Sequence, residues 1–160
     1  MDPPRMTAAE EVARIFNLLH DGSIEEAEAR GGALRLKVAI PYLAESADPG
    51  RAFFILELAA CSDLTFTAWV SGREENREIT DLAEIFAEDL EIMESSASAT
   101  GVKVVCLTDA TRRGTCGGVL TFSCAAARVF DPRHNEVGLA KLESLAKRYW
   151  DAFSSQSSRE

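Results

Sequence analysis

GVKVVCLTDATRRGTCGGVLTFSCAAARVFD, residues 101–131, is the stretch of sequence that decides the fold. Two apolar runs, Val102–Leu107 and Val119–Ala127, flank the turn-rich polar segment Thr108–Gly118. In the second run Leu120, Phe122, Cys124 and Ala126 fall on one side and Thr121 and Ser123 on the other, which is typical of a strand with one buried face. The stretch therefore predicts the central β-hairpin of a small sheet.

The composition of the 160-residue chain is that of a globular protein, with 46% hydrophobic and 27% charged residues. It predicts a single domain over residues 1–160, with flexible tails at 1–6 and 154–160. The net charge of −9 argues against free nucleic acid as a partner, because phosphate binding requires clustered lysine and arginine. The chain shows no apolar leader and no run of about 18 apolar residues, so we expect a cytoplasmic protein without a membrane span.

Two helices are predicted near the ends of the chain. A capping box that begins at Thr7 precedes a helix over Ala8–His20, which Gly22 is expected to end in the left-handed conformation. A second helix is predicted over Val137–Phe153, with Asn135 as a candidate cap. The apolar stripe of this helix, expected to pack on the sheet, comprises Val137, Leu142, Leu145, Ala146, Tyr149, Trp150 and Phe153.

A second hairpin is predicted near the N-terminus. Leu34–Ile40 alternates apolar residues with Arg35, Lys37 and Ala39, and the preceding pair Gly31-Gly32 is a two-residue turn signal. These features favour a hairpin in which Ile24–Ala29 pairs with Leu34–Ile40. A helix over Ser23–Arg30 is the alternative, because this segment is rich in glutamate and alanine.

The middle of the chain contains two more apolar runs, Ala52–Ala60 and Leu64–Val70, whose short separator allows either one long bulged strand or a tight hairpin. The other segments are predicted to be loops at Tyr42–Arg51 and Ser71–Arg77, a short helix at Asp81–Glu88 and the start of a strand at Leu90–Ile92. Local connections without βαβ alternation predict an α+β fold. We expect a twisted, mostly antiparallel sheet of five to seven strands, with an N-terminal and a C-terminal helix packed on it and no internal repeat.

No group of residues indicates a reaction. Cys116 lies in a glycine-rich loop with Arg112 and Arg113, where a thiol could be activated, but a nucleophile also needs a base. The only histidines are His20 and His134, and the His-Asp pair at His20 has no further metal ligands at a suitable spacing. The other three cysteines lie in apolar runs and are expected to act as small hydrophobic residues. We therefore predict no catalytic residues, no metal site, no cofactor and no enzymatic activity.

Negative charge is concentrated between Arg73 and Glu94, where nine acids and two bases account for most of the net charge of −9. Such a run is often only a solvated surface, but concentrated charge also steers a basic protein towards its binding site. The spacing of a calcium-binding loop is absent. The predicted partner-binding residues are Glu74, Glu75, Glu78, Asp81, Glu84, Glu88, Asp89 and Glu91.

The segment His20–Ile24, HDGSI, followed by a glycine turn and the strand Leu34–Ile40, resembles the opening of a group of small bacterial domains. Several of these occur among the immunity proteins of polymorphic-toxin systems. The resemblance covers the first third of the chain and the general order of strands closed by a helix. It implies a domain without catalytic residues that binds one cognate toxin and blocks it, and it favours the N-terminal hairpin.

The first hypothesis is therefore a cytoplasmic protein-binding domain of the immunity or antitoxin type, which occludes a basic toxin or effector through an acidic face. A secretion chaperone for a basic effector is one alternative, because acidic α+β proteins of this size commonly hold basic effectors. A small thiol-dependent enzyme or ligand-binding module centred on Cys116 is the other.

Overall fold

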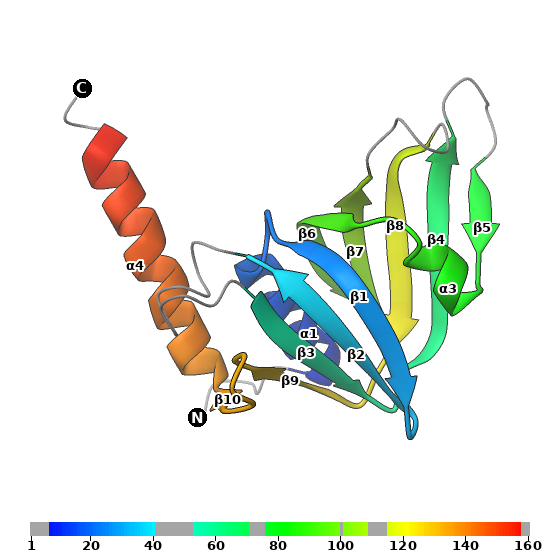
Figure 1. The fold of residues 1–160 in the computed structure, drawn as a ribbon, viewed down its shortest axis with the longest axis horizontal. Helices are drawn as coiled ribbons and strands as arrows, with labels where there is room; N and C mark the ends of the chain where they lie inside the picture. The colour runs from blue at the N-terminus through cyan, green and yellow to red at the C-terminus, as the bar shows by residue number, and fades with distance from the viewer. Residues whose placement is uncertain (1–6, 41–52, 71–75, 100, 109–114, 158–160) are drawn as a thin grey trace.

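The computed structural model describes residues 7–40, 53–70, 76–99, 101–108 and 115–157, which form an open, mostly antiparallel sheet with helices beside it (Figure 1). Within these residues the sheet has ten strands, where the sequence predicted five to seven, and the α+β class is confirmed. No helix in these ranges is long and apolar enough to cross a membrane. The predicted loop at Tyr42–Arg51 and the tail at 1–6 lie outside the described residues.

The sheet consists of two halves of five strands each, which meet at a short junction. In spatial order the first half is β10 (Glu136–Val137), β9 (Ala126–Phe130), β3 (Phe53–Ala59), β2 (Ala33–Ala39) and β1 (Ser23–Arg30). The second half continues with β6 (Leu90–Ser98), β7 (Gly101–Leu107), β8 (Thr115–Ser123), β4 (Ser62–Val70) and β5 (Arg77–Ile79). β1 and β6 pair only where Ser23 lies opposite Glu91 and Ile24 opposite Leu90, and they separate beyond this point.

Both halves contain the same run of four elements, a helix followed by three strands. The helix α1 (Ala8–Leu18) leads into β1, β2 and β3, and the single-turn helix α3 (Leu82–Ile85) leads into β6, β7 and β8. β1 and β6 each carry a register shift just after the junction, between Ile24 and Glu26 and between Ile92 and Glu94. This repeated order is not visible in the sequence, and it allows the two halves to be compared element by element.

Apolar side chains from both halves form one core on the inner face of the sheet, by which we mean the face that carries the buried residues. α1 lies on this face and packs along β6 and β7. The ring of Phe16 on α1 is 5.8 Å from the ring of Phe122 on β8. The helix begins at the predicted capping box of Thr7 and Glu10. Its buried side chains, which follow the 3.6-residue period, are Val12, Ala13, Ile15 and Phe16.

The end of α1 differs from the prediction. The helix ends at Leu18, and Asp21, rather than Gly22, takes the left-handed conformation, with φ 68°. Gly22 is buried, and a Cβ atom there would lie 2.9 Å from the carbonyl oxygen of Leu19. Glycine is therefore required for the close approach of the chain to the helix, not for the cap.

The N-terminal hairpin is confirmed, because β1 and β2 are joined by Gly31 and Gly32 at φ 59° and 81°. The alternative of a helix over this segment is wrong. Both predictions for β3 and β4 are also wrong: β3 pairs with β2 and β9, whereas β4 pairs with β8 and β5. Ala60 and Asp63 have positive φ angles and change the direction of the chain after β3 and at the start of β4. The chain thereby passes from one half of the sheet to the other.

The stretch 101–131 forms three strands. β7 and β8 pair as the predicted hairpin, but β8 ends at Ser123 and Ala126–Phe130 forms β9, which pairs with β3 in the other half. The hairpin is not central, since β1 and β6 occupy the middle of the sheet. β5, at one edge, includes Arg77, which the sequence assigned to a loop.

α4 (Leu139–Ser157) begins and ends later than predicted and runs beside the sheet (Figure 1). Val137 belongs to β10, and Asn135 lies in the turn before that strand. α4 packs mainly against α1, where Glu143 accepts a hydrogen bond from Arg14 at 3.2 Å. The helix includes residues 154–157, which were predicted to be part of a tail. The burial predicted for its terminal aromatic residues falls outside the described side chains.

Candidate protein-binding surface

The predicted acidic residues follow the chain as it passes from β5, at the edge of the sheet, to β6 in the middle. We call residues 80–89, which include α3, the crossover. Asp81, Glu84, Glu88 and Asp89 lie on the crossover, Glu78 and Glu91 lie on the strands at either end, and Glu74 and Glu75 lie outside the described residues.

The crossover is held on the inner face by apolar side chains. Ile85 is only 3% exposed, and Leu82 on α3 and Phe86 directly after it also pack against the core. Asp81 caps α3 by accepting the backbone N–H of Glu84 at 3.0 Å, and Glu84 in turn forms an ion pair with Arg77. Asp81 and Asp89 are exposed. The crossover is thus anchored by its apolar side and presents carboxylates to solvent.

The structure does not bring all the predicted acids together. Glu78 lies opposite Thr67 on the outer face of β5, and Glu91 lies opposite Leu107 on the outer face of β6. Three strands, β4, β8 and β7, separate Glu78 from Glu91. The carboxylates on the crossover are therefore the part of the predicted set that lies together on the inner side of the sheet.

A second group of acids, which the sequence-based set omitted, lies on β1. Beyond the junction with β6, the segment Glu26–Arg30 pairs with β2 on one side and with no described strand on the other; we call it the β1 edge. Glu26 and Glu28 are exposed on it. Glu28 lies 3.9 Å from Arg30, and among the described residues Glu26 forms no ion pair. The sequence signal was the alternation of glutamate and alanine in this strand.

An apolar pocket of about 470 Å³ is formed where the β1–β2 hairpin, the β3–β4 connection and the crossover meet. Its apolar lining consists of Ala29, Ala33, Leu34, Cys61, Leu64 and Leu82. Asp63 also lines the pocket, and Asp81 lies between the lining residues Thr80 and Leu82 in the chain. The pocket therefore combines apolar walls with nearby carboxylates, which suits a ligand with both apolar and basic groups.

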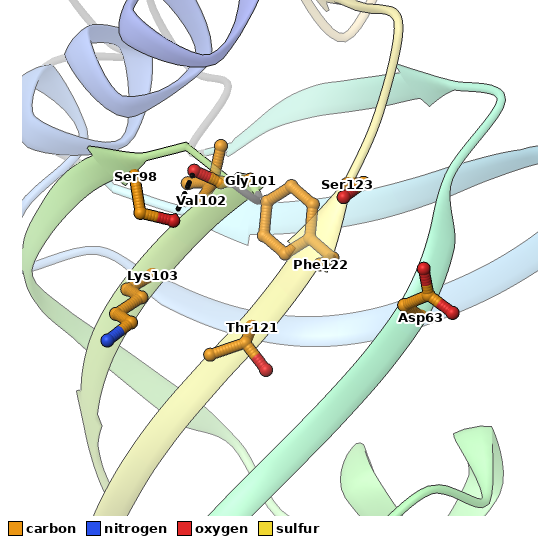
Figure 2. Close-up of a pocket in the computed structure, with 8 residues that line it drawn as sticks. All are labelled: Asp63, Ser98, Gly101, Val102, Lys103, Thr121, Phe122 and Ser123. Atoms are coloured by element: carbon orange, nitrogen blue, oxygen red, sulfur yellow. Dashed lines mark hydrogen bonds between the residues drawn. The ribbon is translucent and has the colours of Figure 1, made fainter.

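A smaller pocket of about 200 Å³ lies over β4, β7 and β8 (Figure 2). Figure 2 shows Lys103, Thr121 and Asp63 on three neighbouring strands, with Ser98 donating a hydrogen bond to the carbonyl oxygen of Gly101 at 3.3 Å. One ammonium and one carboxylate are the charged groups among its lining residues, and neither histidine nor cysteine lines it.

Three of the four thiols are held in their protonated form by their surroundings. Burial raises the pKa of Cys106 to about 12. Burial, followed by the nearby Cys124, raises the pKa of Cys61 to about 11. Burial also raises the pKa of Cys124. Since the thiolate is the nucleophile, these three cysteines act as the small hydrophobic residues that the sequence indicated.

Cys116 and the histidines do not share a site among the described residues. Cys116 is exposed, and the arginines of its loop lie in residues 109–114, outside the described ranges. His20 lies at the C-terminal end of α1, with Nδ1 2.7 Å from the carbonyl oxygen of Asn17. The pockets lined by His20 and by His134 contain no cysteine.

The side chains in the described ranges include no group of three or more histidine, cysteine, aspartate or glutamate residues placed to hold a metal ion. Comparisons with protein-family models, with curated proteins and with solved structures found no match to this chain.

Proposed function

We propose that this protein is a protein-binding domain of the immunity type, which covers a basic polypeptide without carrying out a reaction. One observation carries the proposal: an apolar pocket has Asp63 in its lining and Asp81 next to lining residues in the chain, and the two segments beside it present further exposed carboxylates, Glu26 and Glu28 on the outer face of the β1 edge and Asp89 on the crossover. An apolar centre with a charged rim is the usual composition of a protein interface. The resemblance of the segment His20–Ile24 to immunity domains supports the inhibitory role.

The carboxylates and the apolar pocket have different roles in this proposal. Exposed carboxylates attract a basic partner over a range set by the Debye length, about 8 Å at physiological ionic strength, and so raise the association rate. The apolar pocket offers area whose burial holds the complex together once it has formed. Such an inhibitor acts by occupying the surface of its partner, so it needs no catalytic group.

The free edge of β1 favours a second candidate function, a chaperone that holds a segment of a basic effector in extended form. A strand edge recognises an extended chain better than a folded surface, because its exposed groups are backbone N–H and C=O. The two functions differ in the state of the partner: an inhibitor binds a folded basic protein, and a chaperone binds a segment before folding.

Neutralising one carboxylate on the β1 edge and one on the crossover should slow the association of a basic peptide. We expect Glu26→Gln combined with Asp89→Asn to lower the association rate constant for a labelled oligolysine roughly fivefold at low ionic strength, and to flatten its dependence on salt. Stopped-flow fluorescence measures both quantities. Glu84 and Glu88 are less suitable, because Glu84 holds Arg77 and Glu88 is half-buried.

The matched control is Glu11→Gln combined with Asp151→Asn, which removes the same charge from exposed positions on α1 and α4. We expect this pair to change the association rate less than about twofold, because its charges lie on α1 and α4 and not on the β1 edge or the crossover. Equal slowing by both pairs would mean that binding follows net charge alone, and the proposed surface would then be wrong.

A further inference from the structure

We infer that the β1 edge accepts one extended segment of the basic partner as an added strand, and that the residues of this segment alternate between basic and apolar. The inference rests on the proposed function and names the part of the partner that is bound. It depends on three observations: an unpaired strand edge, a pocket beside it, and the alternation of glutamate and alanine along it.

The edges of β1 and β6 beyond their junction are equivalent in the two halves of the sheet, but only the edge of β6 is covered. Beyond the junction, the edge of β6 is covered by α1, and Asn17 acts there like a backbone group of a neighbouring strand. Its Nδ2 donates to the carbonyl oxygen of Ser95 at 3.0 Å, and its Oδ1 accepts the N–H of Ser95 at 2.7 Å. α3 precedes β6 in the chain as α1 precedes β1, but it is a single turn of four residues. No described element pairs with the equivalent edge of β1.

The geometry of the hairpin shows which backbone groups are free. In an antiparallel ladder, alternate residues direct both N–H and C=O towards the partner strand. Arg30 and Ala33 flank the two-residue turn and form the hydrogen-bonded pair next to it. Counting back from Arg30, Ala27 and Ala29 direct their N–H and C=O groups away from β2. An added strand would therefore bond to these two residues.

Side chains on β1 determine what an added strand can carry. Ala27 and Ala29 pair in register with the buried residues Leu36 and Leu34, so they face the core side, where Ala29 lines the apolar pocket. Residues of the added strand that face the same way meet only small methyl groups and have room for large apolar side chains. Residues that face the other way lie beside Glu26 and Glu28, where opposite charges stabilise a cross-strand pair.

Positive charges near the β1 edge already have partners. Arg35, opposite Glu28, donates to Glu57 at 3.1 Å. Lys37, opposite Glu26, lies over the ring of Phe53 at 4.7 Å from its centroid. Arg30, on the same face of β1, lies 3.9 Å from Glu28. The β1 edge thus presents two carboxylates and one guanidinium to a new strand, and the excess of negative charge favours lysine or arginine in that strand.

A second copy of this chain is a poor occupant of the same edge. β1 contains three glutamates and one arginine, and the chain has a net charge of −9. Pairing two such strands would bring like charges close together, which destabilises cross-strand pairs. A basic segment of another protein can form hydrogen bonds with the unpaired backbone groups of the β1 edge and can also pair with its carboxylates.

The experiment uses a synthetic peptide that alternates lysine and leucine, compared with a scrambled peptide of the same composition. We expect the alternating peptide to bind at least roughly tenfold more tightly in fluorescence anisotropy, because only it places lysine and leucine on opposite faces of a strand. N-methylation of one alternate set of its residues should abolish binding, and methylation of the other set should be tolerated. Equal binding by both methylated peptides would overturn the inference.

A variant tests the pocket from the protein side. Ala29→Phe fills the pocket and should lower the affinity for the alternating peptide roughly tenfold. Ala140→Phe, at an exposed position on α4, is the matched control and should leave the affinity unchanged. Circular dichroism and sedimentation establish that each variant is folded and report whether it is monomeric. Unchanged affinity in a folded Ala29→Phe protein, or self-association through β1, would overturn the inference.

The outcomes separate the inference from the proposed function. If neutralising Glu26 and Asp89 slows oligolysine but the alternating peptide binds no better than its scrambled form, the acidic surface stands and the added strand is wrong. If oligolysine associates equally fast with the Glu26/Asp89 variant and its control, and the alternating peptide binds Ala29→Phe and its control equally well, both the proposed acidic surface and the proposed added strand are wrong.

Discussion

Replacing Phe16 by alanine will lower the free energy of unfolding by about 3–5 kcal/mol. The Phe16 side chain is 0% exposed and connects α1 to the inner face of the sheet through Phe122, whose ring lies 5.8 Å away. Its removal deletes buried apolar area and leaves a cavity that the surrounding strands fill only in part. Urea unfolding followed by circular dichroism measures the change.

The control for this prediction is Glu11→Ala on the exposed side of the same helix, which should change the stability by no more than about 0.5 kcal/mol. The comparison separates the contribution of the core contact from that of helix propensity. A loss below about 1.5 kcal/mol for Phe16→Ala would mean that α1 is not an essential part of the core.

The second large effect is expected for Gly118→Ala on β8. A Cβ atom at this position would collide with the carbonyl oxygen of Thr67, and it would lie 2.8 Å from the ring of Phe66. Gly118 pairs with Ala68 on β4, so the obstructing atoms include backbone that is fixed by the sheet. Because the strands must move apart, we expect a destabilisation of about 3 kcal/mol, at the upper end for overpacked cores.

Gly138→Ala is the matched control for that substitution, because no atom lies within 4 Å of the Cβ position there. It should be neutral within about 0.5 kcal/mol in the same unfolding experiment. If Gly118→Ala is as stable as Gly138→Ala, the close packing of β8 against β4 described above is incorrect.

Elements with local causes were predictable from the sequence. The capping box at Thr7 starts α1, and Gly31 and Gly32 supply the positive φ angles of a two-residue turn. The hairpin of β7 and β8 follows from two alternating runs around a polar turn. Each of these depends on residues that are close together in the chain, so one sequence is sufficient to find them.

Elements with distant partners were not predictable in the same way. Nothing near Ala60 shows that β3 and β4 belong to different halves of the sheet, because their partners are chosen by core packing. Val137 continues the apolar period of α4, yet it belongs to β10, where it pairs with Val129 of β9 and is only 4% exposed. In such cases tertiary packing, and not the local sequence pattern, determines which element a residue belongs to and which strand it pairs with.

The candidate surface also contains some residues that the sequence could indicate and others that depend on the order of the whole sheet. The crossover acids formed a continuous run in the sequence, and their concentration was visible directly. Glu26 and Glu28 were visible only as part of a strand, since whether a strand has a free edge depends on the order of the whole sheet. The pocket next to Ala29 requires three distant segments to meet, which no local pattern can indicate.

Amide hydrogen exchange of the protein with the alternating lysine–leucine peptide tests most directly the claim that this chain acts by binding a basic segment. We predict that the amides of Ala27 and Ala29 exchange at least roughly tenfold more slowly when the peptide is bound, because each gains a hydrogen bond to the added strand. Unchanged exchange at both amides, or protection confined to the outer face around the exposed Leu107, would contradict the account.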